Sequence, residues 1–264
     1  MKWSEEVKKE LEKVPFFVRG RVKKKIEKEA AKSGSGEVLL EHVHACRKRF
    51  LTTMEDEVSG YQVETCFGPG GCPNRAVICE GLAEDIGKRL RMWDLKAFLK
   101  KIVPGPLKIH HEFRISISDC PNACSRPQIV DIGLIGACHP VVTDEICSDC
   151  GACVKTCREE AISFVDDAPF VDGKKCLSCG KCIAVCPSGA LRAGKSGYRI
   201  LLGGKLGRHP HLATELPEIF KKDEIPEIID RCLEYYKNHC IGGEHLGEIM
   251  GKNGMEKILK KIIS

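Results

Sequence analysis

The sequence is short of aromatic residues, long apolar runs and excess charge. Aromatic side chains make up 6% of the 264 residues, and the net charge of +5 is spread along the chain. No dense basic and aromatic stripe is present, so nothing indicates a nucleic-acid-binding protein. No run of about 18 apolar residues exists, which predicts no transmembrane helix and no membrane association. The charged segment 1–13 lacks the apolar stretch of a secretory signal, so we expect a cytoplasmic protein.

Cysteine is the abundant residue that calls for an explanation. The chain has 17 cysteines, an odd number, and no export signal. In a reducing compartment such a set does not predict a disulfide framework. Thiolates are soft ligands that favour iron–sulfur clusters, zinc or copper. The cysteines therefore predict metal binding.

The local pattern predicts an α+β fold interrupted by a small insert. Ser4 is placed to cap a first helix, and a second follows Pro15 to about Ala31. Residues 60–72 are expected to form a glycine-rich loop. We expect further helices at 37–50, 74–90, 94–102 and 226–239, and a pair over 243–263 that Asn253-Gly254 divides. We expect strands at 113–117, 129–136 and 198–204.

The insert, residues 143–192, carries two cysteine sets with the same spacing. In each set three cysteines lie two residues apart and a fourth follows three residues later; the sets are Cys147, Cys150, Cys153, Cys157 and Cys176, Cys179, Cys182, Cys186. In bacterial two-cluster ferredoxins the fourth cysteine binds the other cluster. The spacing therefore predicts one 4Fe–4S cluster on Cys147, Cys150, Cys153 and Cys186, and a second on Cys176, Cys179, Cys182 and Cys157.

Zinc is the alternative ligand for these pairs, because Cys-x2-Cys also suits zinc. A zinc site needs four ligands, but it does not explain why the third and fourth cysteines of each set lie at these particular spacings. The spacing therefore favours clusters. The roughly fifty residues resemble a bacterial-type ferredoxin. One departure is that Arg158, not proline, follows Cys157.

Four other cysteines form two pairs outside the insert. Cys66 and Cys72 lie in CFGPGGCPN, and Cys120 and Cys124 lie in SDCPNACSRP. Their flexible, glycine- or proline-bearing loops allow four thiolates to hold one more cluster. With the insert, this predicts three 4Fe–4S clusters per chain.

The second cysteine set resembles the sulfite/nitrite reductase family over about residues 60–260. FRISISDCPNACSRP with DIGLIG resembles the family's central motif, YRILLGGKLGRHP its glycine-rich strand, and GEHLGEIMGKNGMEKIL its C-terminal helix. A ferredoxin insert at this place resembles the dissimilatory-type and anaerobic sulfite reductases. The resemblance implies three parts: a helical module (1–50), a sirohaem and 4Fe–4S half domain (51–142 with 193–264), and the ferredoxin domain (143–192).

The resemblance also implies cofactors and an activity. A sirohaem would join the clusters, with Cys124 bridging its iron to the cluster that Cys66, Cys72 and Cys120 complete. Sirohaem carboxylates call for cationic partners, and the candidates near the motifs are Arg75, Arg114, Arg126, Lys205 and Arg208. The implied reaction is six-electron reduction of sulfite or nitrite, with electrons entering through the insert. No catalytic residue is assigned, since His110, His111, His139, His209 and His211 are more often simply solvated.

The chain departs from the family at its N-terminus. It has room for one of the two halves that enclose a sirohaem, so we expect a homo-oligomer or a partner subunit to supply the basic residues for a small oxyanion. Residues 3–30 resemble a helical module of the dark-operative protochlorophyllide reductase B subunit. No Gly-x-Gly-x-x-Gly follows a strand, so the electron donor is a separate ferredoxin or reductase. An electron-transfer subunit without its own catalysis, or a tetrapyrrole-handling protein, are the alternatives.

Overall fold

The computed structural model describes residues 1–254, 258, 259 and 262, and the side chains of these apart from 51–54. The chain divides into two compact units. The N-terminal unit comprises Met1–Val58 with Pro104–His110, and the second unit comprises Ser59–Val103 with the chain from His111 onward. Each unit is described by itself.

The N-terminal unit is a small helical module. Helices α1 (Glu5–Glu12), α2 (Phe16–Lys32) and α3 (Leu40–Glu57) alternate with the two-residue parallel strands β1 (Lys2–Trp3) and β2 (Glu37–Val38). Ser4 caps α1, because its hydroxyl accepts a hydrogen bond from the N–H of Val7 at 3.4 Å. The buried core is small and consists of Val7, Ile26, Ala30 and Val38.

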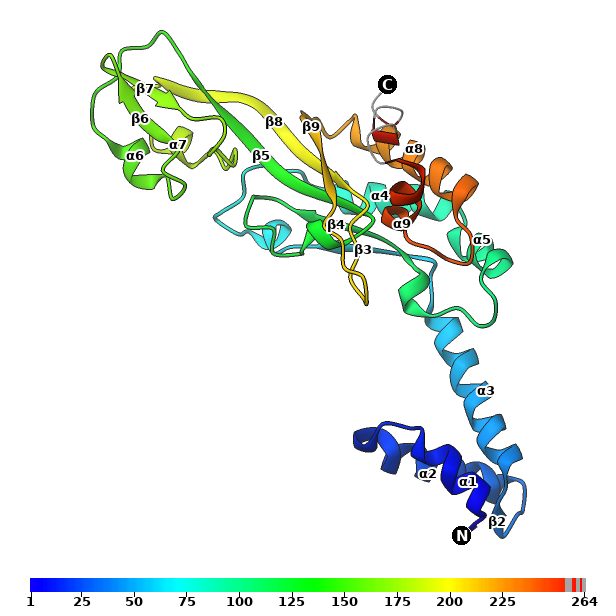
Figure 1. Ribbon diagram of the computed structural model, residues 1–264. Coiled ribbons are helices and arrows are strands. Elements are labelled where there is room, and N and C mark those ends of the chain that lie inside the picture. The colour runs from blue at the N-terminus through cyan, green and yellow to red at the C-terminus, as the bar shows by residue number, and fades with distance from the viewer. Residues whose placement is uncertain (255–257, 260–261, 263–264) are drawn as a thin grey trace. The chain divides into compact units, whose positions relative to one another are not determined.

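The second unit is built on a five-stranded mixed sheet. Its strands are β3 (Tyr61–Thr65), β4 (Phe113–Ser118), β5 (Ile132–Val142), β8 (Leu191–Leu202) and β9 (Thr214–Phe220). They lie in the order β3-β4-β5-β8-β9; β3, β4 and β5 are parallel, whereas β5–β8 and β8–β9 are antiparallel. Figure 1 shows β5 and β8 running on together beyond the other strands.

Helices cover one face of this sheet. They are α4 (Leu82–Met92), α5 (Leu95–Ile102), α8 (Ile225–His239) and α9 (Leu246–Asn253) (Figure 1). The main core lies between them and the strands: Phe113, Ile115 and Ile117 of β4 are all buried there. Because side chains alternate along a strand, Arg114, Ser116 and Ser118 point to the opposite face.

A compact segment at the end of the β5–β8 ribbon holds eight of the cysteines. It contains α6 (Ala152–Thr156), the antiparallel hairpin β6 (Ile162–Val165) and β7 (Ala168–Val171), and α7 (Lys181–Ala184). Asp166 and Asp167 both have positive φ, of 50° and 59°, as a two-residue hairpin turn requires. The short single-turn segments elsewhere are η1 (Gly68–Gly70), η2 (Ile109–His111) and η3 (Pro127–Ile129).

Two sequence expectations are wrong. Residues 61–65, expected in a loop, form strand β3; Tyr61 and Val63 pack against the core, so the alternation was present in the sequence. The helix expected from residue 74 starts at Leu82. The chain before it is held by the sheet instead, since the N–H groups of Ala76 and Val77 donate to the carbonyl of Asp119 at 2.8 and 3.3 Å. Strand β9 was not expected.

The other expected elements are present, although some bounds differ: the helix expected at 37–50 is α3, Leu40–Glu57, and the strand expected from residue 129 begins at Ile132. Helix α5 is capped by Asp94, and α8 ends at His239 as expected. Strands β5 and β8 both extend further toward the insert than their apolar cores indicated. The second member of the expected C-terminal helix pair falls mostly outside the described residues.

Candidate functional site

Four cysteines meet at one edge of the sheet. Cys66 follows β3 directly, and Cys120 lies two residues after β4. Because β3 and β4 are parallel neighbours, their carboxyl ends lie at the same edge. Cys72 comes after the turn Gly68–Gly70, and Cys124 lies in the loop that leads to β5.

Cys120 lies within electrostatic range of the other three cysteines. Burial raises the pKa of the Cys120 thiol, and the nearby Cys66, Cys124 and Cys72 each raise it further, while the N–H of Asn122 lowers it. Cys120 is buried, Cys66 and Cys72 are half-buried, and Cys124 is exposed. The group is thus closed on one side and open at Cys124.

Backbone N–H groups point at the Cys66 sulfur. Gly68 and Asp119 donate to it at 3.2 and 3.3 Å. Such donors stabilise a thiolate and tune any cluster that the thiolate binds. A side chain at position 68 would force a shift, because a Cβ there would lie 2.0 Å from the Asp119 carboxylate oxygen Oδ2.

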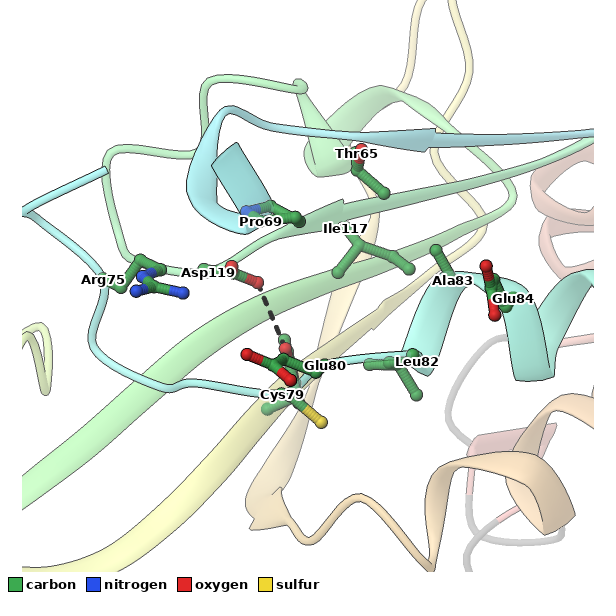
Figure 2. A pocket seen from close by; sticks show the side chains of 12 residues that line it. Thr65, Pro69, Arg75, Cys79, Glu80, Leu82, Ala83, Glu84, Ile117 and Asp119 are labelled. Atoms are coloured by element: carbon green, nitrogen blue, oxygen red, sulfur yellow. Dashed lines mark hydrogen bonds between the residues drawn. The ribbon is translucent and has the colours of Figure 1, made fainter. Parts of the chain in front are cut away.

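Asp119 is a buried carboxylate beside this group. Its Oδ1 accepts a hydrogen bond from the Tyr198 hydroxyl at 3.2 Å. Burial raises the pKa of Asp119, although the Tyr198 hydrogen bond and the charge of Arg75 lower it. Figure 2 shows the Asp119 side chain in a hollow of about 310 Å³ that Arg75 and Ile117 also line. Sequence reasoning missed Asp119 and Tyr198; the only signal was that Asp119 precedes Cys120.

A serine network holds the Cys124 loop against the sheet face away from the helices. The Ser116 hydroxyl donates to the carbonyl of Ser125 at 2.6 Å. The Ser118 and Ser125 hydroxyls lie 2.7 Å apart, and Ser125 also donates to the carbonyl of Ile117 at 2.8 Å. Cys124 therefore stands on a loop that is anchored by the residue next to it.

The five expected cations do not form one cluster. Arg75 lies with Asp119 in the hollow on the helix side, whereas Arg114 points from β4 to the other face. Lys205 forms an ion pair with Glu248 at 2.5 Å. Burial raises the pKa of Glu248, but the hydrogen bonds from Lys205 and from the N–H of His245, together with the nearby positive charge, lower it overall. Arg126 and Arg208 are exposed.

Arg114 carries the clearest sign of a missing partner. Its guanidinium donates to Glu64 at 3.2 Å. Its Nε is buried and has no hydrogen-bond partner; among the described residues it is the one buried side-chain nitrogen or oxygen in this condition. A buried unpaired donor costs free energy, so an anionic group on this sheet face suits the structure.

In the insert, Cys186 lies with the first cysteine set. Burial raises the pKa of Cys153, and Cys147 and Cys186 raise it further. Cys150 is also near Cys186; hydrogen bonds from the N–H of Ala152 and from Ser148 lower its pKa.

In the second set, Cys176 and Cys179 lie near Cys182. Burial, followed by nearby Cys179 and Cys176, raises the pKa of Cys182 to about 12. The sulfurs of Cys157 and Cys186 accept similar hydrogen bonds, from the N–H groups of Ala161 and Leu191 at 3.3 and 3.4 Å. Within the described part of the chain, no three His, Cys, Asp or Glu side chains converge on a position for a single metal ion.

The second set abuts strand β5. The N–H of Cys138 donates to the carbonyl of Ser178 at 2.6 Å, and Cys138 pairs with Cys179 in an isolated bridge. The His139 Nδ1 lies 3.1 Å from the Ser178 hydroxyl. The loop that carries Cys179 is therefore fixed to the sheet through backbone and side-chain bonds.

Comparison with known proteins decides the family. The sequence pattern of the "Nitrite and sulphite reductase 4Fe-4S domain" matches residues 61–264, more than half of the chain. The chain belongs to this family. The family that the sequence resembles is thus confirmed, and its description supports binding of a 4Fe–4S cluster. A second pattern, "Proto-chlorophyllide reductase 57 kD subunit", matches residues 3–47.

Individual relatives of this nitrite and sulphite reductase domain agree. The chain is 35% identical over 199 residues to the coenzyme F420-dependent sulfite reductase of Methanocaldococcus jannaschii, covering 75% of this chain and 30% of that protein. It is 29% identical over 236 residues to one subunit of the anaerobic sulfite reductase of Salmonella typhimurium, covering 85% of this chain and 68% of that one. The chain thus spans about a third of the first relative.

A solved structure shows the same fold. Dissimilatory sulfite reductase I matches with a TM-score of 0.54 and 19% identity, over 82% of this chain and 57% of that chain. The mixed helix-and-strand fold expected from the sequence is confirmed. No helix in the described ranges is long and apolar enough to cross a membrane.

Proposed function

We propose that the protein reduces sulfite at a sirohaem coupled to a 4Fe–4S cluster, and that electrons enter through a ferredoxin domain at residues 143–192. The observation that carries the proposal is the meeting of Cys66, Cys72 and Cys120 with an exposed Cys124 at one sheet edge. The names of the relatives favour sulfite over nitrite.

Cys66, Cys72, Cys120 and Cys124 would hold the cluster beside the sheet. The buried and half-buried members give it a partly dry environment, and the N–H groups of Gly68 and Asp119 offset the charge on the Cys66 sulfur. Cys124, exposed on its anchored loop, would share its sulfur with the sirohaem iron.

The sheet face away from the helices suits a macrocycle that bears carboxylates. Arg114 offers an unsatisfied Nε there, and the exposed Arg126 and Arg208 are free to reach anionic groups. When bound, sirohaem supplies an open iron position for a sulfur oxyanion and a path for electrons. The protein binds the carboxylates, orients the ring and fixes Cys124 through the Ser125 hydrogen bonds. Lys205 contributes less, since Glu248 already neutralises it.

The insert would hold two clusters. The proximity of Cys186 to Cys150 and Cys153 supports the exchange of the fourth ligand between sets. Cys157 is placed by analogy with Cys186, since both pack in the same small apolar cluster as Cys153 and Cys182.

The junction with β5 supports electron entry through the insert. Cys179 lies beside Cys138, and Gly136, two residues earlier on β5, packs so closely on Asp119 that a Cβ would lie 2.4 Å from its carbonyl oxygen. Two residues of strand span about 7 Å. A short route through strand β5 and one close packing contact thus leads from the second insert cysteine set to the neighbour of Cys120.

The function requires partners. The relatives include one subunit of an anaerobic sulfite reductase, which supports partner subunits, one of them an electron donor. A second chain, identical or different, would complete the enclosure of the macrocycle and add cations for sulfite.

A direct test is sulfite-dependent oxidation of reduced methyl viologen by anaerobically purified protein, with and without Cys124→Ser. Sulfide formation that Cys124→Ser abolishes, while Cys46→Ser of the N-terminal unit leaves it intact, supports the proposal. Turnover that survives in Cys124→Ser contradicts it.

A second candidate is an electron-transfer subunit without its own catalysis. It is favoured by the ion pairs that occupy Arg114 and Lys205. It predicts clusters that reduce rapidly in a protein that binds no tetrapyrrole and does not turn over sulfite, nitrite or hydroxylamine.

A further inference from the structure

A hollow of about 670 Å³ lies inside the N-terminal unit, and nothing proposed above makes use of it. Its lining comes from the end of α1, one stripe of α2 and one stripe of α3. Three helices therefore bound it. This volume is in the range of pockets that hold a single small ligand.

The walls of the hollow are apolar. Val18, Val22 and Ile26 recur on α2 at four-residue spacing, and Val43 and Phe50 lie seven residues apart on α3. Such spacings place side chains on one helix face. Ile26 is buried, but Val18 and Val22 are only half-buried and Phe50 is 53% exposed. The apolar side chains next to the small core of the unit are thus only partly covered, and they line the hollow.

The rim of the hollow is cationic. Arg21, Lys25 and Arg47 are exposed at its edge. The acidic residue in the lining, Glu10, already forms an ion pair with Lys13, and this hydrogen bond lowers the pKa of Glu10. Lys25 also lies 5.5 Å from the centroid of the Phe50 ring, so charge and apolar surface meet at this edge. Because the charges of Glu10 and Lys13 offset each other, the lining keeps three positive charges at the edge of the apolar space.

We propose that this hollow binds one amphipathic carboxylate per chain. The apolar body of the ligand would lie against Val18, Val22 and Val43, and its carboxylate would reach Arg21 or Arg47. Burial of apolar surface supplies most of the affinity, and the cations select an anion over a neutral or cationic molecule of the same shape. An acidic helix of another protein would match the same charges, but three bounding helices and a ligand-sized volume favour a small molecule.

The test uses two probes that share the same pyrene and alkyl chain and differ in the terminal group, the anion 1-pyrenebutyrate and the neutral alcohol 1-pyrenebutanol. Equilibrium dialysis of each against the full-length, cluster-loaded protein measures affinity and stoichiometry. We expect one pyrenebutyrate per chain, with pyrenebutanol bound several-fold more weakly. Equal affinity for the two probes, or binding of many molecules per chain, would overturn the proposal.

Variants locate the binding. Val18→Trp fills the hollow and is expected to weaken pyrenebutyrate binding more than tenfold. Arg47→Gln removes one exposed charge and is expected to weaken it about two- to fivefold. Lys24→Gln, which removes an exposed charge of α2 outside the lining, is expected to leave it unchanged.

Controls keep the result interpretable. The far-UV circular dichroism of each variant should match that of the parent, which excludes loss of the helices. Sedimentation of the probe-free protein tests the other occupant: a dimer that Val18→Trp dissociates, with no probe bound, would assign the hollow to a second copy and refute ligand binding.

Discussion

The N–H of Asp119 donates a hydrogen bond to the sulfur of Cys66 at 3.3 Å, across the ends of two parallel strands. The N–H of Cys66 in turn donates to the carbonyl of Ile117 at 2.9 Å. Two cysteines 54 positions apart in the numbering, Cys66 and Cys120, are brought together because β3 and β4 pair along their whole common length. The candidate site thus depends on the sheet as well as on its loops.

Replacement of Cys66 by serine is expected to remove one cluster and leave those of the insert. With three clusters of four irons, the iron content should fall from about twelve to about eight per chain. Iron and acid-labile sulfide measured after anaerobic purification check this. Cys46→Ser is the control, and an unchanged iron content in Cys66→Ser would exclude Cys66 as a ligand.

Gly68→Ala is expected to destabilise the protein by about 1–3 kcal/mol, because the new Cβ collides with the Asp119 carboxylate. Gly70→Ala in the same turn is the matched control, since a Cβ there meets nothing within 4 Å. Thermal unfolding of the two variants side by side measures the effect. Equal melting temperatures would show that the turn can move away from Asp119.

Ser125→Ala is expected to loosen the Cys124 loop, because it removes the hydroxyl that binds Ser118 and the carbonyl of Ile117. Each lost hydrogen bond costs about 1 kcal/mol. We predict less tetrapyrrole per chain at unchanged iron content in the insert. Ser196→Ala, an exposed position on β8, is the control; the same tetrapyrrole content in both variants would rule out an anchoring role.

Gly180→Ala tests the junction between the insert and β5. Gly180 and Gly151 both precede a short helix with φ near +70°, but only at Gly180 would a Cβ meet Cys138, at 3.1 Å. Alanine strains both positions equally, so the difference between the variants reports the junction. We expect slower reduction of the sheet cluster in Gly180→Ala than in Gly151→Ala, measured by rapid-freeze electron paramagnetic resonance. Identical rates would remove the insert from the electron path proposed here.

Asp230 clamps α8 to α4 and gives a pH-dependent stability. It accepts hydrogen bonds from Arg89 Nε at 2.7 Å and Trp93 Nε1 at 2.9 Å. Burial raises the pKa of Asp230, but these donors outweigh burial and lower it overall. A lowered folded-state pKa means that the stabilisation is full above the unfolded value of about 3.9 and is lost as pH falls through the folded value.

Asp230→Asn should therefore lower the free energy of unfolding by about 1–2 kcal/mol at pH 7, with the deficit shrinking below about pH 4. Denaturant titrations across this range measure it. Asp85→Asn, which removes the exposed pairs with Lys88 at 3.4 Å and Lys222 at 3.8 Å, should change little. A deficit for Asp230→Asn that stays constant to pH 3 would contradict the assignment.

The sequence predicted the local groupings better than the distant ones. Proximity of Cys186 to Cys150 follows from a short repeated spacing, and its role as a ligand remains a prediction. The hydrogen bond from Tyr198 to Asp119 joins residues that are 79 positions apart in the sequence, and no local sequence pattern predicts it. Strand β3 was missed because the glycines after Thr65 dominated the pattern, although Tyr61 and Val63 alternate with polar residues.

The five candidate cations also show that sequence spacing does not predict tertiary placement. Proximity to the motifs made Arg75, Arg114 and Lys205 look equivalent. The structure places Arg75 on the helix side, leaves the Arg114 Nε unpaired and ties Lys205 to Glu248. Which face a residue occupies and which acid it meets are set by tertiary packing, so spacing alone could not separate them.

The most direct measurement is the anaerobic quantification of iron, sulfide, zinc and sirohaem per chain, together with the electron paramagnetic resonance spectrum of the reduced protein. The account predicts about twelve irons with matching sulfide, one sirohaem, and magnetic coupling between the macrocycle and one cluster that Cys124→Ser removes. Stoichiometric zinc in place of iron, or a full set of clusters with no tetrapyrrole beside Cys124, would contradict it.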